Sequence, residues 1–197
     1  MTQFEQLDLL LTEYGGTIQT FQVTNNGISK PVFYSYVKER GLEQAAHGVY
    51  VSPDTWTDAM YILHLRCSQA VFSHETALFF HDLTDREPLK YTITVRTGYN
   101  PSRLQEDGFQ VYTVKKDLHA IGITTVQTPF AHSVPVYDME RTICDLLRSR
   151  KNIEIQVFQE ALKQYTRRKD KNLRILMKYA SMFHVEKILR PYLEVLL

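Results

Sequence analysis

The feature that most constrains the fold is the short spacing between glycines in the first fifty residues. Apolar residues recur at helical spacing over 7–14, and Gly15-Gly16 then ends that helix. Thr20 is the expected N-cap of a short second helix over 21–26, which Gly27 ends with a tight turn at positive φ. This part of the chain must therefore fold as several short elements.

A third helix and a hairpin follow. Ser29 is the expected N-cap of that helix, Pro31 sits in its first turn, and Gly41 ends it. Residues 45–51 predict a small β-hairpin centred on His47-Gly48. Three short helices and a hairpin form the order of a winged helix, whose third helix lies in the major groove of DNA while the hairpin touches the backbone. The candidate DNA-binding residues lie on this helix and hairpin: Lys30, Tyr34, Ser35, Lys38 and His47.

The remaining residues predict a mixed second domain. After a boundary at 53–57, two helices are expected, followed by four stretches that alternate like the strands of a half-buried antiparallel sheet. The chain then turns helical after Asp138, and Pro191 is expected to kink or divide the last helix. The predicted fold class is α+β: a winged helix-turn-helix over 1–52, then a mixed α/β domain over 56–197 with a small antiparallel sheet and a C-terminal helical bundle.

Composition indicates an ordinary protein of the cytoplasm. A chain of 197 residues can bury a core without a disulfide or a metal. Its two cysteines, Cys67 and Cys144, form neither a disulfide framework nor a zinc motif, and they fit a reducing cytosol. No apolar run approaches the roughly 18 residues that a membrane span needs, and the N-terminus lacks the basic start of a signal peptide.

Charge is distributed unevenly along the chain. The net charge is +1, but residues 151–197 hold ten basic and five acidic side chains, whereas residues 1–50 hold three basic and five acidic ones. Such asymmetry points to an acidic partner. The candidate nucleic-acid or antitoxic patch, called the C-terminal basic patch below, comprises Lys163, Arg167, Arg168, Lys169, Lys171, Arg174 and Lys178. The alternative is a solvated junction between two helices.

Catalytic chemistry finds little support. Ser73 is expected to cap a helix, and it is poorly placed to pair with His74, because adjacent helical residues do not face each other. The histidines lack zinc-ligand spacing. We therefore expect no enzyme activity, no metal and no cofactor. The rival hypothesis is a metal-dependent enzyme acting on nucleic acid or on a toxin through Asp82, Asp85, Asp138 or Asp145, although Asp138 reads as a helix cap and Asp145 as an i, i+4 partner of Arg141.

Five segments in a fixed order carry a family resemblance. They are His47-Gly48-Val49-Tyr50, the stretches 72–78 and 81–85, the Asp138-x-x-Arg141-Thr142-Ile143-Cys144-Asp145 run, and the basic run 167–171. In this order, and over essentially its whole length, the chain resembles the AbiEi family of bacterial antitoxins. One departure is that the third helix and wing hold Pro31, Ser35, Gln44 and His47 where relatives often carry arginines.

The resemblance implies the antitoxin of a phage-defence, abortive-infection toxin–antitoxin pair of type IV. Such a protein represses its own operon by binding inverted repeats in promoter DNA through the winged helix. Its C-terminal domain counteracts an AbiEii-like, nucleotidyltransferase-like toxin without forming a stable complex with it. By analogy we expect a monomer in solution and several copies on DNA. A further alternative is a winged helix that serves only as a protein-binding module.

Overall fold

The computed structural model describes residues 2–196 and shows an α+β protein. The chain divides into two compact units. The first runs to Ser68 and includes Gln127–His132, and the second holds Gln69–Val126 and the residues from Ser133 onward. The first unit is therefore larger than the expected winged helix, which covers residues 1–52. In the described chain, no helix is both long and apolar enough to cross a membrane.

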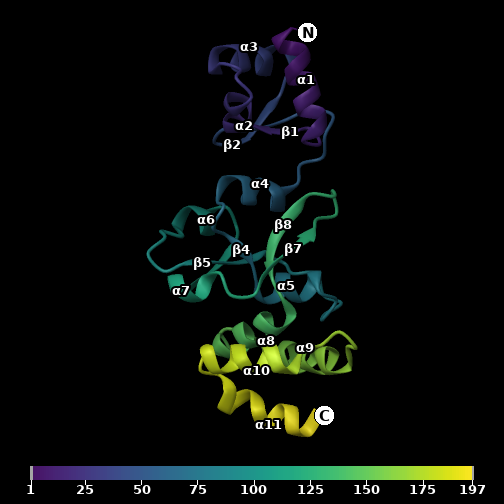
Figure 1. Ribbon diagram of the computed structural model, residues 1–197, viewed down its shortest axis with the longest axis vertical. Coiled ribbons are helices and arrows are strands. Elements are labelled where there is room, and N and C mark those ends of the chain that lie inside the picture. Colours follow the sequence, from purple (N-terminus) through teal and green to yellow (C-terminus); the bar gives the residue numbers. More distant parts are fainter. Residues whose placement is uncertain (1, 197) are drawn as a thin grey trace. The chain divides into compact units, whose positions relative to one another are not determined.

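The first unit combines four helices with a three-stranded sheet (Figure 1). Both sheet pairings are antiparallel, in the order β1-β3-β2, and β2 and β3 form the expected hairpin around His47-Gly48. Its elements are α1 (Gln3–Glu13), β1 (Thr17–Gln19), α2 (Thr20–Asn25), α3 (Lys30–Arg40), β2 (Glu43–Ala46), β3 (Val49–Val51) and α4 (Ala59–Arg66).

Local signals explain where the short helices begin and end. α3 starts after Ser29 and ends at Gly41, whose φ of +67° is the left-handed conformation that glycine adopts readily, so both boundaries are confirmed. The Ser29 side chain, however, makes no capping hydrogen bond. For α2 the expected cap was wrong. Gln19 takes that position, and its backbone N–H donates to Oε1 of Gln22 at 2.7 Å.

The second unit contains a five-stranded sheet with the order β6-β5-β4-β8-β7. The predicted antiparallel sheet is wrong: β4 and β5 are antiparallel, but β4 pairs with β8 and β5 with β6 in parallel. Alternating hydrophobicity indicates which face of a strand is buried, but it does not indicate the direction of the strand. β5 and β6 can run in parallel because the segment between them, which contains α6 (Ser102–Glu106), returns the chain to the end of the sheet where β5 begins. The strands are β4 (Val71–Phe72), β5 (Thr92–Arg96), β6 (Gln110–Val114), β7 (Ile123–Gln127) and β8 (Ser133–Tyr137).

Helices α8–α11 gather on one side of this sheet, with α5 between the sheet and α8 (Figure 1). Of the two outcomes expected at Pro191, a kink or a division of the last helix, the division does not occur, since α11 runs through the proline. Leu189 and Leu193, on either side of the proline, are both buried and hold the two halves on the same core. The remaining helices are α5 (His74–Phe80), α7 (Lys116–His119), α8 (Met139–Arg148), α9 (Ile155–Arg167), α10 (Leu173–Met182) and α11 (Glu186–Leu196).

Candidate nucleic-acid interface

Helix α3 divides its residues between the core and the solvent. Phe33 and Tyr36 are completely buried, while Tyr34 is 48% exposed. All five residues predicted to bind DNA are exposed: Lys30, Tyr34, Ser35, Lys38 and His47. The spacing explains this division, since Phe33 and Tyr36 lie three residues apart on one helical face. The polar side of α3 is therefore accessible.

Aromatic packing fixes α3 against its neighbours. The rings of Phe33 and Tyr50 meet edge to face, with centroids 5.2 Å apart, and join α3 to the hairpin. On the other side, the hydroxyl of Tyr36 donates to Oδ1 of Asp8 in α1 at 2.7 Å. Burial, followed by the hydrogen bond to the Asp8 carboxylate, raises the pKa of Tyr36 well above its usual value. These contacts fix the position of α3 against α1 and the hairpin.

A hollow of about 390 Å³ lies between α2, α3 and the hairpin. It brings together Lys30, Tyr34 and His47 but does not include Ser35 or Lys38. Sequence reasoning missed Phe21, which also lines it and is 69% exposed. One signal was present: Phe21 is two residues from the buried Val23, and on a helix this places the two on opposite sides.

Positive charge on this surface is limited. Arg40 is committed to Asp8, with 2.6 Å between Nη2 and Oδ2, and the hydrogen bond to that carboxylate raises the pKa of Arg40. Both partners of the ion pair are largely exposed, so it adds little stability. Lys30 and Lys38 are the lysines that α3 presents to solvent. Two lysines can neutralise few phosphates, so electrostatic affinity from this surface alone is modest.

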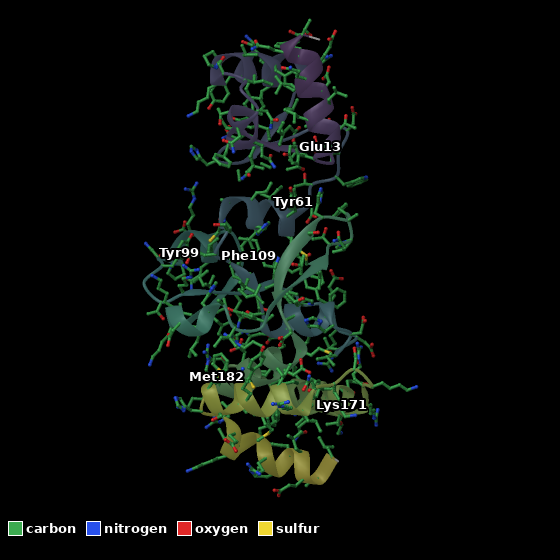
Figure 2. All side chains as sticks on the ribbon, in the orientation of Figure 1. Glu13, Tyr61, Tyr99, Phe109, Lys171 and Met182 are labelled. Carbon is green, nitrogen blue, oxygen red and sulfur yellow. The ribbon has the colours of Figure 1, made fainter. Side chains whose placement is uncertain are left out.

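The C-terminal basic patch spans the end of α9, the following loop and α10; Lys171 is labelled in Figure 2. Arg168 makes two hydrogen bonds, of 2.8 and 2.9 Å, to the carboxylate of Asp170, and these lower the pKa of Asp170 to about 2. Lys171 donates to the carbonyl of Arg168 at 3.0 Å. These two residues thus fold the loop. The exposed side chains of the patch are Lys163, Arg167, Lys169, Arg174 and Lys178.

Ser73 and His74 are closer than predicted. Nδ1 of His74 lies 2.9 Å from Oγ of Ser73, because His74 adopts a φ of +48° at the start of α5. The Ser73 side chain makes no cap. The imidazole is completely buried, stacks on Tyr112 with centroids 3.7 Å apart, and reaches Oγ of Ser149 at 3.0 Å. Burial, with help from Arg148 and Arg141, lowers the pKa of His74 to about 3. A neutral, enclosed imidazole is a packing element that no substrate can reach.

Two of the four acidic residues of the rival enzyme hypothesis, Asp138 and Asp145, have structural partners. Asp138 caps α8 by accepting from the backbone N–H of Arg141 at 2.7 Å, as predicted. The predicted pair of Arg141 and Asp145 is also confirmed, at 2.9 Å, with both side chains fully buried. Asp82 and Asp85 are exposed. Across residues 2–196, no three His, Cys, Asp or Glu side chains come together as metal ligands would.

A buried cluster around Asp58 escaped sequence reasoning. Oδ1 of Asp58 accepts from the backbone N–H groups of Met60 and Tyr61 at the start of α4, both at 3.1 Å. Oδ2 accepts from Oγ1 of Thr128 at 2.6 Å and lies 2.8 Å from Nδ1 of His132, whose ring stacks on Tyr61. This carboxylate holds residues 127–132 within the first unit. The partners lie about seventy positions apart in sequence, so no local pattern could have revealed them.

The architecture has a solved counterpart. The crystal structure of the RV2827C protein from Mycobacterium tuberculosis is similar to this chain, with a TM-score of 0.60 and 12% sequence identity. The similarity covers 92% of this chain and 72% of that chain. At this identity it concerns the fold alone. No protein-family model matches the chain, and neither does any curated protein.

Proposed function

We propose that this chain is a DNA-binding antitoxin that represses its own operon, as its resemblance to the AbiEi family implies. In this proposal, residues 1–52 act as a winged helix-turn-helix, and α8–α11 act as the helical bundle of an antitoxin domain. The order α1-β1-α2-α3-β2-β3 with an antiparallel sheet supports the first assignment.

The observation that carries the proposal is the exposed polar side of α3 beside the β2–β3 hairpin. Lys30 and Tyr34 point away from the core that Phe33 and Tyr36 occupy, and His47 stands at the hairpin turn. In this proposal α3 enters the major groove of promoter DNA and the His47 hairpin contacts the backbone. The surface offers few cations, so affinity comes from several copies bound to inverted repeats, helped by the C-terminal basic patch.

The direct test measures binding of the full chain to its own promoter over a range of salt concentrations. Lys30→Ala and Lys38→Ala should each weaken binding and reduce the slope of log K against log salt by about one unit, because each lysine neutralises one phosphate. Lys90→Ala, an exposed lysine of the second unit, is the matched control. Unchanged affinity and slope for both α3 variants would refute this docking.

The second half of the proposal concerns toxin neutralisation. Through its second unit the chain counteracts a nucleotidyltransferase-like toxin without a stable complex. The exposed members of the C-terminal basic patch are the proposed antitoxic surface, and reversing the charge of Arg167 and Arg174 together should abolish rescue of toxin-expressing cells. The same variant should still bind promoter DNA, though more weakly. Co-elution of purified toxin and antitoxin would contradict the type IV mechanism.

A further inference from the structure

A small pocket in the second unit collects cationic side chains that neither half of the proposed function uses. Its volume is about 270 Å³. β5 and β6 run parallel, and Thr97 and Lys115, the residues that follow the ends of these two strands, both line the pocket. Ligands of sheets with parallel strands commonly bind beyond the carboxyl ends of such strands.

Three basic side chains from different elements line this pocket. Lys115 follows β6, Arg148 ends α8, and His184 follows α10. Met182, labelled in Figure 2, marks the end of α10 beside them. Hydroxyl donors are present as well, on Thr97 and Thr113. None of the described residues that line the pocket is acidic.

The guanidinium of Arg148 is held in place and retains net positive charge. Its Nη2 donates to the carbonyl of Thr113 at 3.3 Å, and the group lies over the ring of Phe183 at 5.7 Å. One oxygen of Asp145 lies 3.8 Å from Arg148, but that carboxylate is also the partner of Arg141. Two guanidinium groups share one carboxylate, so an excess positive charge remains beside the pocket.

His184 occupies a position where glycine is the usual residue. Its φ of +58° lies in the left-handed region just after the end of α10, where a β-carbon is disfavoured. The chain nevertheless carries an exposed imidazole there, at the pocket.

We propose that this pocket binds the terminal phosphate group of a small phosphorylated ligand. Basic side chains from three elements together with two hydroxyl groups suit a phosphate monoester, whose three terminal oxygens all accept hydrogen bonds. A pocket of about 270 Å³ has room for a phosphate and part of a sugar, since pockets for whole drug-sized ligands begin at roughly 300 Å³. A phosphate monoester offers three terminal oxygens, whereas a phosphodiester within a duplex offers two.

The test is calorimetric titration of the full chain with inorganic phosphate, a nucleoside monophosphate and a nucleoside triphosphate at constant ionic strength. We expect saturable binding of at least one of them. Lys115→Ala and His184→Asn should each weaken it about tenfold or more, because a charge-assisted hydrogen bond to phosphate is lost. Asparagine tolerates the left-handed conformation, so His184→Asn spares the backbone. Lys90→Ala, at an exposed site elsewhere in the unit, should bind as wild type does.

The three titrants separate the sources of the phosphate. Equal affinity for all three identifies the phosphate alone as the ligand chemistry, whereas tighter binding of a nucleotide adds contacts to the nucleoside; both results support the pocket. No saturable binding at millimolar concentrations overturns the proposal. It also fails if both pocket variants bind as wild type does, or if Lys90→Ala weakens binding as much as they do.

Discussion

Replacing His74 by asparagine should change how the stability of the protein depends on pH. The folded protein holds this imidazole neutral, with a pKa of about 3 against 6.5 in the unfolded chain. Between pH 3 and pH 6.5 the imidazole is protonated in the unfolded state but neutral in the folded state. The free energy of unfolding therefore falls by about 1.4 kcal/mol for each pH unit by which the pH is lowered. From pH 8 to pH 4.5 the loss amounts to about 3 kcal/mol.

His74→Asn removes this contribution while accepting the backbone conformation, since asparagine adopts positive φ more readily than most residues. At pH 8 the variant should be less stable than wild type by about 2 kcal/mol, because it loses the stacking on Tyr112 and the contact with Ser149. On acidification, however, wild type should lose about 3 kcal/mol more than the variant. The two stabilities should therefore cross near pH 5, and at pH 4.5 the variant should be the more stable by about 1 kcal/mol.

Urea unfolding followed by far-ultraviolet circular dichroism, at a series of pH values, measures this difference. His184→Asn makes the same substitution at a φ of +58° on an exposed residue and controls for the backbone effect. The reasoning is refuted if wild type and His74→Asn lose stability in parallel from pH 8 to pH 4.5. Such a result would mean that the imidazole accepts a proton without leaving its buried site.

Three further predictions concern other positions. Phe21→Ser should leave thermal stability within about 0.5 kcal/mol of wild type, since the ring is 69% exposed, yet weaken promoter binding in a gel shift; full affinity would remove Phe21 from the interface. Asp58→Ala should lower the free energy of unfolding, measured by urea titration, by about 3 kcal/mol, because the carboxylate accepts hydrogen bonds from four partners. A loss below about 1 kcal/mol would show that water replaces the carboxylate. Gly122→Ala should destabilise the protein by about 2 kcal/mol more than Gly27→Ala. Both glycines have φ near +77°, but a β-carbon at Gly122 would lie 2.7 Å from Cβ of Arg141, whereas Gly27 faces open space. Equal melting temperatures for the two variants would contradict this prediction.

Local sequence patterns determined the parts of this protein that depend on neighbours along the chain. Glycines at positions that need a positive φ predicted where α3 ends and where the hairpin turns. The polar residues on the side of α3 opposite Phe33 and Tyr36 predicted the candidate interface. The Asp138 cap and the Arg141–Asp145 pair also follow from spacing within one helix. Each of these features spans only a few residues, so its geometry can be derived without knowing the fold.

Only the tertiary structure decided what depends on distant segments. Strand direction in the second sheet, the contact of His74 with Ser149, and the convergence of Lys115, Arg148 and His184 on one pocket all join residues far apart in sequence. Burial converts His74 from a candidate base into a neutral packing element, and the same burial makes its pKa a measure of folding. These properties arise from desolvation and from contacts between elements distant in sequence, and local periodicity predicts neither.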